Sequence, residues 1–591
     1  MLLFISPAAL AQSPLINTGE RPSISLDGEW NIIIDPYENG YYEYRWHENP
    51  DGFFKDKKPA NKSDRVEYDF DTSDKLHVPG DWNTQKKELL FYEGTIWYRK
   101  LFDFSARIGR RTFLRFGAAN YHAIVYLNGR KLGEHVGGFT PFAFEITKDV
   151  RPTNNSLVVK VDNSRCEECV PSLNTDWWNY GGLTRSVQLF ETPETYIDDF
   201  CVQLEKGSAK TISGWIRLNG GRPKQRVVVA IPSAGCELSV ETDQSGYAQL
   251  RCPVSLNLWS PEHPVRYDLM IASETDTVRD RIGFRTLGTK GYDILLNGQP
   301  VFLRGICIHE EAPYRSGRAF TRDDALTLLG WAKELGCNFV RLAHYPHNEQ
   351  MIDVADSLGL LVWSEIPVYW TIRWDNESTF QNASRQLAES MTRDKNRACI
   401  AFWSVSNETP LTEPRLHFLK GLLQQARAAD STRLLTAAME RHYADPHMQA
   451  IDDPLGEFVD VLGCNEYIGW YDGLPAKADS MSWSTVYQKP VIMSELGGEA
   501  LSGYHADSLT IWSEEFQESF YRHQVAMLSR IPFLRGMSPW ILMDFRSPRR
   551  QLPGIQDFHN RKGLISDKGE KKKAFYVLQE YYRTRMQNTT R

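Results

Sequence analysis

The spacing of hydrophobic residues changes near residue 286. Before it, short runs of alternating apolar and polar residues are separated by turn residues, which predicts β-strands. Residues 112–116 and 123–127 are examples, and the hairpin dipeptide Asn128-Gly129 follows the second. After it, short apolar runs alternate with amphipathic stretches at helical spacing, which is typical of successive β–α units. The first part therefore predicts all-β domains and the second an α/β domain.

Four segments follow from these patterns. Residues 1–11 read as a signal-peptide remnant, because they are apolar and end in Ala9-Leu10-Ala11. Residues 12–195, with long loops between aromatic-rich strands, favour a jelly-roll-like sandwich. Residues 196–286 have the closer spacing of an immunoglobulin-like β-sandwich. Residues 287–591 predict a (β/α)8 TIM barrel, and we expect the protein to be exported, to the periplasm or outside the cell.

The barrel prediction depends on eight apolar runs with strand-like length and on one well-marked helix. The runs are residues 302–308, 339–343, 360–363, 399–405, 434–438, 459–463, 491–493 and 537–542. The helix spans residues 323–335: Thr321 and Asp324 form a capping-box pattern at its start, and Gly336 ends it.

Composition excludes several classes of protein. The net charge of −7 gives no basic field that would attract nucleic acid. No run beyond the first residues reaches the roughly 18 apolar residues of a membrane span. The nine cysteines are spread along the chain. Cys166 and Cys169 have the spacing of half a zinc site without a second half, so a loop disulfide or two free thiols is expected there, and Cys236 and Cys252 are placed to bridge. We expect no metal and no cofactor.

Polar or ionisable residues follow nearly every predicted barrel strand, at the end where the active sites of barrels lie. They are His309, Arg341 with His344, Glu365, Asn407 with Glu408, Asn465 with Tyr467, Glu495 and Trp540. Three of them are carboxylic acids, and the pair considered for catalysis is Glu408 and Glu495, each at the end of an apolar run. Cleavage of a glycosidic bond with retention needs such a pair, one protonated and one ionised. Arg341 is expected to keep Glu495 ionised.

The chain resembles glycoside hydrolase family 2 along its whole length. The motifs that carry the resemblance are Gly137-Gly-Phe-Thr-Pro-Phe142, Asn179-Tyr-Gly-Gly-Leu-Thr-Arg185, Arg341-Leu-Ala-His-Tyr-Pro346, Trp403-Ser-Val-Ser-Asn-Glu408 and Ser494-Glu495. The resemblance implies a retaining β-glycosidase with Glu408 as acid/base and Glu495 as nucleophile. It also implies roles in sugar binding: Asn407 holds the 2-hydroxyl, Tyr467 orients Glu495, Trp540 forms the floor, and Asp176 reaches in from the sandwich to hold hydroxyls.

The sugar is indicated by a motif near the end of the chain. Asn560-Arg561-Lys562-Gly563 stands where β-glucuronidases of this family carry Asn-x-Lys, and the segment around Tyr467 and Tyr471 resembles them too. An ammonium and an amide can bind the C6 carboxylate of a uronic acid. The sequence thus predicts an exo-β-glucuronidase that removes glucuronic acid from oligosaccharides or polysaccharide fragments. One departure is Gln556, where some relatives carry arginine, so the carboxylate site is looser or is rebuilt from Arg549 or Arg550.

Two other readings stay open. A β-galactosidase would use the same chemistry and leave Lys562 on the surface. A non-catalytic carbohydrate-binding protein would have no need for both Glu408 and Glu495, which speaks against it. The expected partner is a carbohydrate ending in a uronic acid, and the oligomeric state, a homo-oligomer included, is left open.

Overall fold

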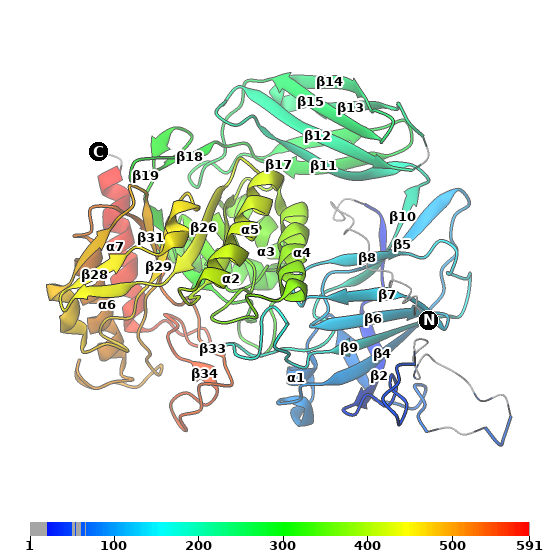
Figure 1. Cartoon of the computed structure of the whole chain (residues 1–591), viewed down its shortest axis with the longest axis horizontal. Coiled ribbons are helices and arrows are strands. Elements are labelled where there is room, and N and C mark those ends of the chain that lie inside the picture. The colour runs from blue at the N-terminus through cyan, green and yellow to red at the C-terminus, as the bar shows by residue number, and fades with distance from the viewer. Residues whose placement is uncertain are drawn as a thin grey trace.

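The computed structural model describes residues 21–49, 54, 59, 61–64, 67–220 and 222–589. The predicted signal-peptide remnant lies outside the described residues, so export stays a prediction. Figure 1 shows three parts: a β-sandwich formed by the first part of the chain, a second sandwich, and a barrel formed by the remainder. No helix in the described ranges is long and apolar enough to cross a membrane.

The first sandwich has a four-stranded sheet in the order β1-β10-β5-β8 and a six-stranded sheet in the order β3-β2-β4-β9-β6-β7. Its alternating strands turn one face inward, and Trp30, Ile96 and Val125 are among the side chains buried between the sheets. The elements are β1 (Ser23–Ser25), β2 (Gly28–Asp35), β3 (Lys75–Val78), α1 (Trp82–Gln85), η2 (Lys87–Leu89), β4 (Thr95–Phe102), β5 (Arg110–Phe116), β6 (His122–Leu127), β7 (Arg130–Val136), β8 (Phe142–Glu145), β9 (Asn155–Asp162) and β10 (Val187–Pro193). Asn128 and Gly129 connect β6 to β7 with φ of 54° and 83°, as the hairpin dipeptide predicts.

The second sandwich packs a three-stranded sheet, β11-β12-β15, on a four-stranded sheet, β14-β13-β16-β17. Cys236 of β14 and Cys252 of β15 form a disulfide that links the two sheets, and Cys166 and Cys169 form one within a loop of the first sandwich. The elements are β11 (Tyr196–Leu204), β12 (Thr211–Asn219), β13 (Arg226–Ile231), η3 (Pro232–Ala234), β14 (Cys236–Glu241), β15 (Tyr247–Pro253), β16 (Tyr267–Ala272) and β17 (Thr277–Ile282). A small sheet of β18 (Leu287–Lys290), β19 (Asp293–Leu296) and β20 (Gln299–Pro300) leads into the barrel.

The barrel has eight parallel strand positions, as predicted. The first is interrupted: β21 pairs with β32 and β22 pairs with β23, and these two pairings close the sheet. The strands are buried on both faces, and every residue of β25 is buried, which is why they read as apolar runs. They are β21 (Leu303–Arg304) with β22 (Cys307–Ile308), β23 (Phe339–Leu342), β24 (Leu361–Glu365), β25 (Ile400–Asn407), β26 (Leu434–Met439), β29 (Leu462–Asn465), β31 (Val491–Glu495) and β32 (Leu534–Met537).

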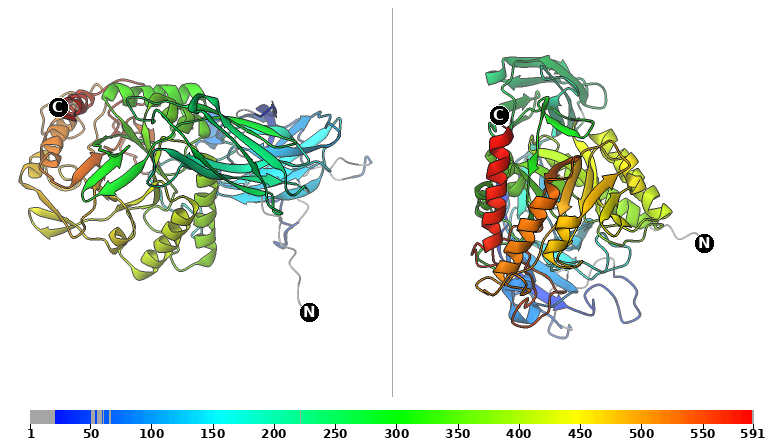
Figure 2. Two further views of the ribbon diagram at one scale, coloured as in Figure 1. Left: turned by 90° about the horizontal axis from the view of Figure 1, so that it is seen from above. Right: turned by 90° about the vertical axis from the view of Figure 1, so that its left-hand side faces the viewer.

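Six α-helices cover the barrel, and Figure 2 shows α6 and α7 side by side on its outer surface. They are α2 (Arg322–Leu335), α3 (Glu349–Leu358), α4 (Glu377–Asp394), α5 (Glu413–Ala429), α6 (Glu514–Leu528) and α7 (Lys573–Thr589). The predicted capping box of α2 is present, and Gly336 ends the helix with φ of 97°. Strands β26 and β29 are followed instead by η4 (Pro454–Glu457), η5 (Pro475–Ser480) and a small sheet of β27 (His442–Asp445), β28 (Met448–Ile451) and β30 (Ser482–Thr485).

The predicted position of the last barrel strand, residues 537–542, is wrong. The strand ends at Met537, before Pro539, which has no N–H to donate to a sheet. Trp540 and Ile541 are buried all the same, because the chain turns across the end of the barrel and packs them beneath the site. Because this loop is buried, its sequence is as apolar as that of a barrel strand, and the segment was therefore predicted as one.

The first sandwich is joined to the barrel by a buried ion pair. Arg185 donates to both carboxylate oxygens of Glu310 at 3.1 Å and to the carbonyl of Pro346 at 2.8 Å. Tyr180, five residues earlier, donates to Glu311 at 2.7 Å. The motif from Asn179 to Arg185 is therefore the part of the sandwich that holds it against the start of the barrel.

We expect Arg185→Gln to destabilise the protein strongly. Removing one partner of a buried pair leaves the other charge uncompensated, at a cost of roughly 3–5 kcal/mol. Calorimetry should show a lower unfolding temperature for this variant. The control is Arg107→Gln, which breaks a pair with Glu191 in which the arginine side chain is 61% exposed. Equal unfolding temperatures for the two variants would contradict the role of Arg185.

Candidate active site

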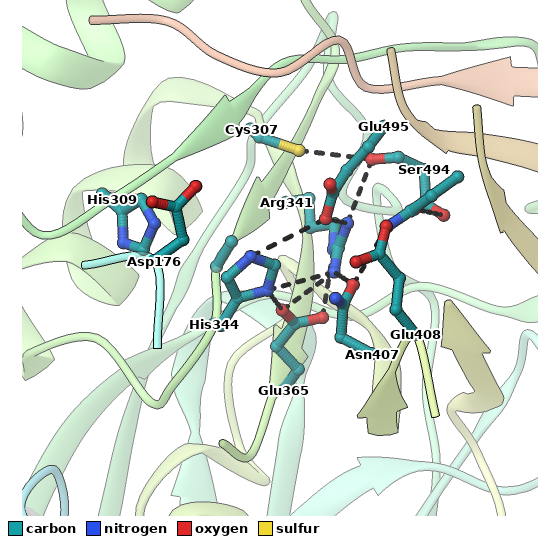
Figure 3. A network of polar contacts seen from close by, with 12 residues as sticks. Asp176, Cys307, His309, Arg341, His344, Glu365, Asn407, Glu408, Ser494 and Glu495 are labelled. Carbon is teal, nitrogen blue, oxygen red and sulfur yellow. Dashed lines mark hydrogen bonds and ion pairs between the residues drawn. The ribbon is translucent and has the colours of Figure 1, made fainter. Parts of the chain in front are cut away.

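The two predicted acids lie at the ends of the fourth and seventh barrel strands. Glu495 is the last residue of β31, and Glu408 directly follows β25. Figure 3 shows both beside the guanidinium group of Arg341. Parallel strands bring their carboxyl ends to one edge of a barrel, so residues far apart in the sequence meet there.

Arg341 is fully buried and connects four strand ends. It makes a two-pronged contact with Glu365, from Nε to Oε2 and from Nη2 to Oε1, both at 3.0 Å. Its Nη1 donates to Glu495 Oε1 at 2.7 Å and to the carbonyl of Ser494 at 3.1 Å. Its Nη2 also donates to Asn407 Oδ1 at 2.7 Å. All five N–H groups of the guanidinium are thus used within the protein.

The two carboxylates that share Arg341 differ in acidity. Burial raises the pKa of Glu365, but Arg341 and the hydrogen bond with His344 outweigh it and bring the pKa to about 2. Burial also raises the pKa of Glu495, and there Arg341, His344 and Tyr467 do not cancel it, since the charge of Glu408 acts in the same direction as burial. Arg341 contacts Glu495 as predicted and acts to lower its pKa, although burial and the charge of Glu408 make the net shift upward. That Arg341 keeps Glu495 ionised stays a prediction.

Glu408 is held by two donors. Its Oε2 accepts from the indole Nε1 of Trp370 at 2.7 Å, and its Oε1 accepts from Asn465 Nδ2 at 2.9 Å. Its φ of 47° places it in the left-handed region, which residues other than glycine seldom adopt. Asn407, one residue earlier, is anchored through Oδ1, whereas its buried Nδ2 has no partner among the described residues. An unpaired buried amide is suited to a substrate hydroxyl.

Aromatic side chains form the walls of the site. Tyr467 donates its hydroxyl to Glu495 Oε2 at 2.7 Å. Trp540 stacks on His344 with ring centroids 4.7 Å apart, and His309 lies edge-on to Trp540 at 5.1 Å. Burial and the neighbouring cations hold the pKa of His309 well below its ordinary value, so its ring is neutral. Flat rings at this position suit the C–H faces of a sugar.

Lys562 lies inside the site and not on the surface. Its side chain is 1% exposed, and its ammonium donates to Tyr471 at 2.9 Å and to Glu499 at 3.2 Å. Its charge also lies 5.5 Å from the ring of Tyr467, which contacts Glu495. Asn560 donates to Asp176 at 3.2 Å. The sequence motif therefore borders the two acids, and the β-galactosidase reading, with Lys562 on the surface, does not fit this placement.

Asp176 extends from the first sandwich into the barrel mouth. It accepts hydrogen bonds from Ser547 at 2.6 Å and from Asn560, and it pairs with Arg550. The short hairpin of β33 (Phe545–Arg546) and β34 (His559–Asn560) brings these partners together. The loop between the two strands carries both Arg549 and Arg550. Sandwich and barrel thus share one site.

Comparisons with known proteins agree with this arrangement. The family model described as "Glycosyl hydrolases family 2, TIM barrel domain" matches residues 288–586, and that of the family's sugar binding domain matches residues 24–193. The β-glucuronidase of Rattus norvegicus is 30% identical, over 100% of this chain and 95% of its own length. The chain belongs to glycoside hydrolase family 2. It is accordingly a glycoside hydrolase, and its substrate is a carbohydrate.

Other relatives of this hydrolase agree. The human β-glucuronidase is 28% identical, over 97% of this chain and 93% of its own. The solved β-glucuronidase of an uncultured Clostridium species has a TM-score of 0.80 at 26% identity and covers 95% of this chain and 98% of its own. A β-galacturonidase from Eisenbergiella tayi, with a TM-score of 0.78 at 24% identity and coverage of 95% and 96%, shares the fold.

The site of this hydrolase brings together every residue that the sequence nominated. Three further residues were missed: Trp370 beside Glu408, Glu499 beside Lys562, and Ser547 beside Asp176. Glu499 stands four residues after Glu495 in the Glu-Leu-Gly-Gly-Glu run, so its position was a usable signal. Trp370 and Ser547 lie in loops without a distinguishing pattern. The described residues contain no cluster of three or more His, Cys, Asp or Glu that could hold a metal ion.

Some relatives carry an arginine at the position of Gln556. The neighbours of Gln556 indicate which arginine of this chain lies in its place. Gln556 donates to Glu499 at 3.0 Å. Arg550 lies 3.6 Å from the same carboxylate, next to Lys562. Arg549 points elsewhere, toward Asn174 and Trp370. Arg550 is therefore the cation available to rebuild the site, and Arg549 is free for another task.

Proposed function

We propose that this hydrolase is a retaining exo-β-glucuronidase that removes terminal glucuronic acid from oligosaccharides or polysaccharide fragments. The observation that carries the proposal is the buried Lys562 ammonium beside the two acids. Lys562 and Arg550 both lie against the single carboxylate of Glu499, and two such cations can also bind the C6 carboxylate of a uronic acid, which a neutral galactoside lacks. The named relatives that are β-glucuronidases support the same choice.

The reaction has two displacement steps. Glu495 attacks the anomeric carbon while Glu408 donates a proton to the departing oxygen, which gives a covalent glycosyl-enzyme. Glu408 then accepts a proton from water as the water attacks the same carbon, and Glu495 leaves. Asn407 donates from Nδ2 to the 2-hydroxyl, a contact that strengthens in the transition state; the lack of a partner for this buried Nδ2 among the described residues supports the role. Tyr467 keeps Glu495 turned toward the sugar.

Four charged groups make up the uronate site. Lys562 and Arg550 supply the positive charge, and Glu499 and Asp176 hold them in place. Lys562 and Arg550 outweigh burial and hold the pKa of Glu499 below its ordinary value, so this carboxyl is ionised. Tyr471, the second contact of Lys562, has a lowered pKa: burial would raise it, but Lys562 and Arg550 prevail. Lys562 and Arg550 are thus held in place by their carboxylate partners before a substrate arrives.

Replacing Lys562 should remove the preference for uronic acids. For Lys562→Ala, kcat/KM on 4-nitrophenyl β-glucuronide should fall by the roughly 2–5 kcal/mol of a broken buried charge pair, about 30-fold or more. The exposed Lys568 gives the control Lys568→Ala, which should behave as wild type. Wild type is measured on the β-galactoside and β-galacturonide as well. Hydrolysis of the galactoside without the glucuronide would refute the proposal.

Azide should separate the roles of the two acids. Glu408→Ala and Glu495→Ala should both lose most activity on the aryl glucuronide. With azide, the Glu408 variant should form the β-glycosyl azide, because Glu495 still makes the covalent intermediate. The Glu495 variant should form the α-azide, because azide then attacks the substrate directly. The anomers are assigned by NMR, and the reverse outcome would exchange the two roles.

The pH profile should respond to Tyr467. Glu495 must be ionised to attack, so kcat/KM rises as the pH increases through its pKa, which burial raises. The Tyr467 hydroxyl lowers this pKa, so Tyr467→Phe should move the acid limb of the profile to higher pH. Tyr576→Phe, at a tyrosine that is 56% exposed, is the control. An acid limb unchanged in Tyr467→Phe would show that another group controls it.

A further inference from the structure

Arg549 lies on the side of the site from which the leaving group departs. A proton donor must touch the glycosidic oxygen, so the residue that leaves lies next to Glu408. Trp370 borders this side, because its indole donates to Glu408 Oε2 at 2.7 Å. The guanidinium carbon of Arg549 lies 4.9 Å from the centroid of the Trp370 ring. This reasoning rests on the proposed function, which assigns proton donation to Glu408.

Contacts from two other loops and from its own loop hold Arg549 in place. Its Nη1 donates to Asn174 of the first sandwich at 2.5 Å, and its ring partner Trp370 follows β24. Its own backbone N–H donates to the buried hydroxyl of Ser547, which is in turn bonded to Asp176. A long side chain that is fixed by contacts from two other loops loses less freedom when it binds a ligand.

The charge of Arg549 has no carboxylate partner among the described residues. The neighbouring arginines differ: Arg550 pairs with Asp176 and lies 3.6 Å from Glu499, and Arg373, near the same rim, pairs with Glu167. Among the described residues, the side chain of Arg549 contacts an amide and an aromatic face, and its backbone N–H contacts a hydroxyl. It is also exposed, so its guanidinium can be reached from solvent. A guanidinium of this kind presents a fork that matches carboxylate or sulfate oxygens.

We propose that Arg549 binds an anionic group on the sugar residue that leaves. The preferred substrate is then an oligosaccharide in which the terminal glucuronic acid is followed by an acidic residue. Trp370 supplies the ring against which the leaving sugar packs, and Arg549 supplies the charge. Lys562 and Arg550 recognise the first carboxylate, and Arg549 recognises the second anion.

Three disaccharides with the same linkage test the proposal. Each carries β-glucuronic acid at the non-reducing end, and the second residue is neutral, sulfated or carboxylated. Wild type should give a higher kcat/KM on one or both acidic substrates, by about fivefold as for an exposed charge pair. The advantage should shrink as salt rises, because exposed charges are screened. The better of the two acidic substrates identifies the anion as sulfate or carboxylate.

Variants assign the effect to Arg549. In Arg549→Gln, the ratio of kcat/KM on the acidic substrate to kcat/KM on the neutral one should fall to about one. Arg549→Lys should keep part of the preference for the acidic substrate. Arg522→Gln removes the same charge from the outer face of α6, where Arg522 is 60% exposed, and should keep the wild-type ratio.

Equal kcat/KM on all three substrates in wild type, or a preference that survives in Arg549→Gln, would overturn the proposal. An Arg549→Gln variant that loses activity equally on every substrate would show a structural role only. Failure to cleave even the neutral disaccharide and aryl glucuronide would instead count against the proposed function.

Discussion

The guanidinium of Arg341 is the interaction on which the site depends. It is completely buried, and its contacts reach the ends of four barrel strands: its own β23, Glu365 of β24, Asn407 of β25 and Glu495 of β31. A lysine could not replace it, because a single ammonium has three donors and no planar fork. One side chain therefore contacts both the nucleophile candidate, Glu495, and the amide of Asn407.

The two carboxylates that contact Arg341 have different acidities, and this difference suits a nucleophilic role for Glu495. Glu365 receives two parallel hydrogen bonds and becomes a strong acid with a pKa of about 2. Glu495 receives one shorter contact, and burial leaves its pKa raised. A carboxylate as stabilised as Glu365 would be a poor nucleophile, whereas Glu495 retains basicity at the atom that must form a bond. Arg341 and His344 together bring Glu365 to a low pKa, whereas Glu495 is positioned by Arg341 and keeps a raised pKa.

The sequence predicted what depends on local pattern and on strand direction. Buried strands such as β25 read as apolar runs, and the end of each run located Glu408 and Glu495. The capping residues of α2 marked that helix at both ends. The prediction of the last strand failed because Trp540 and Ile541 are apolar for another reason, since they are buried in a loop. Trp370 could not be found either, because its role depends on a contact across the site that leaves no pattern in the sequence around it. The acidity of Glu495 depends on the balance between burial and charge, and no spacing of residues reports on that balance.

The first sandwich is part of the active site as well as a neighbour of the barrel. Asp176 receives hydrogen bonds from Ser547 and Asn560 of the barrel, and Asn174 contacts Arg549. These contacts are useful only if the sandwich is fixed to within about half an ångström, the precision that preorganised sites require. The buried pair of Arg185 with Glu310 provides that fixed joint. Because Glu310 directly follows His309 at the end of the first barrel strand, the joint stands on the same rigid edge as the chemistry. An isolated barrel would keep both acids but lose Asp176, which pairs with Arg550, and Asn174, which contacts Arg549.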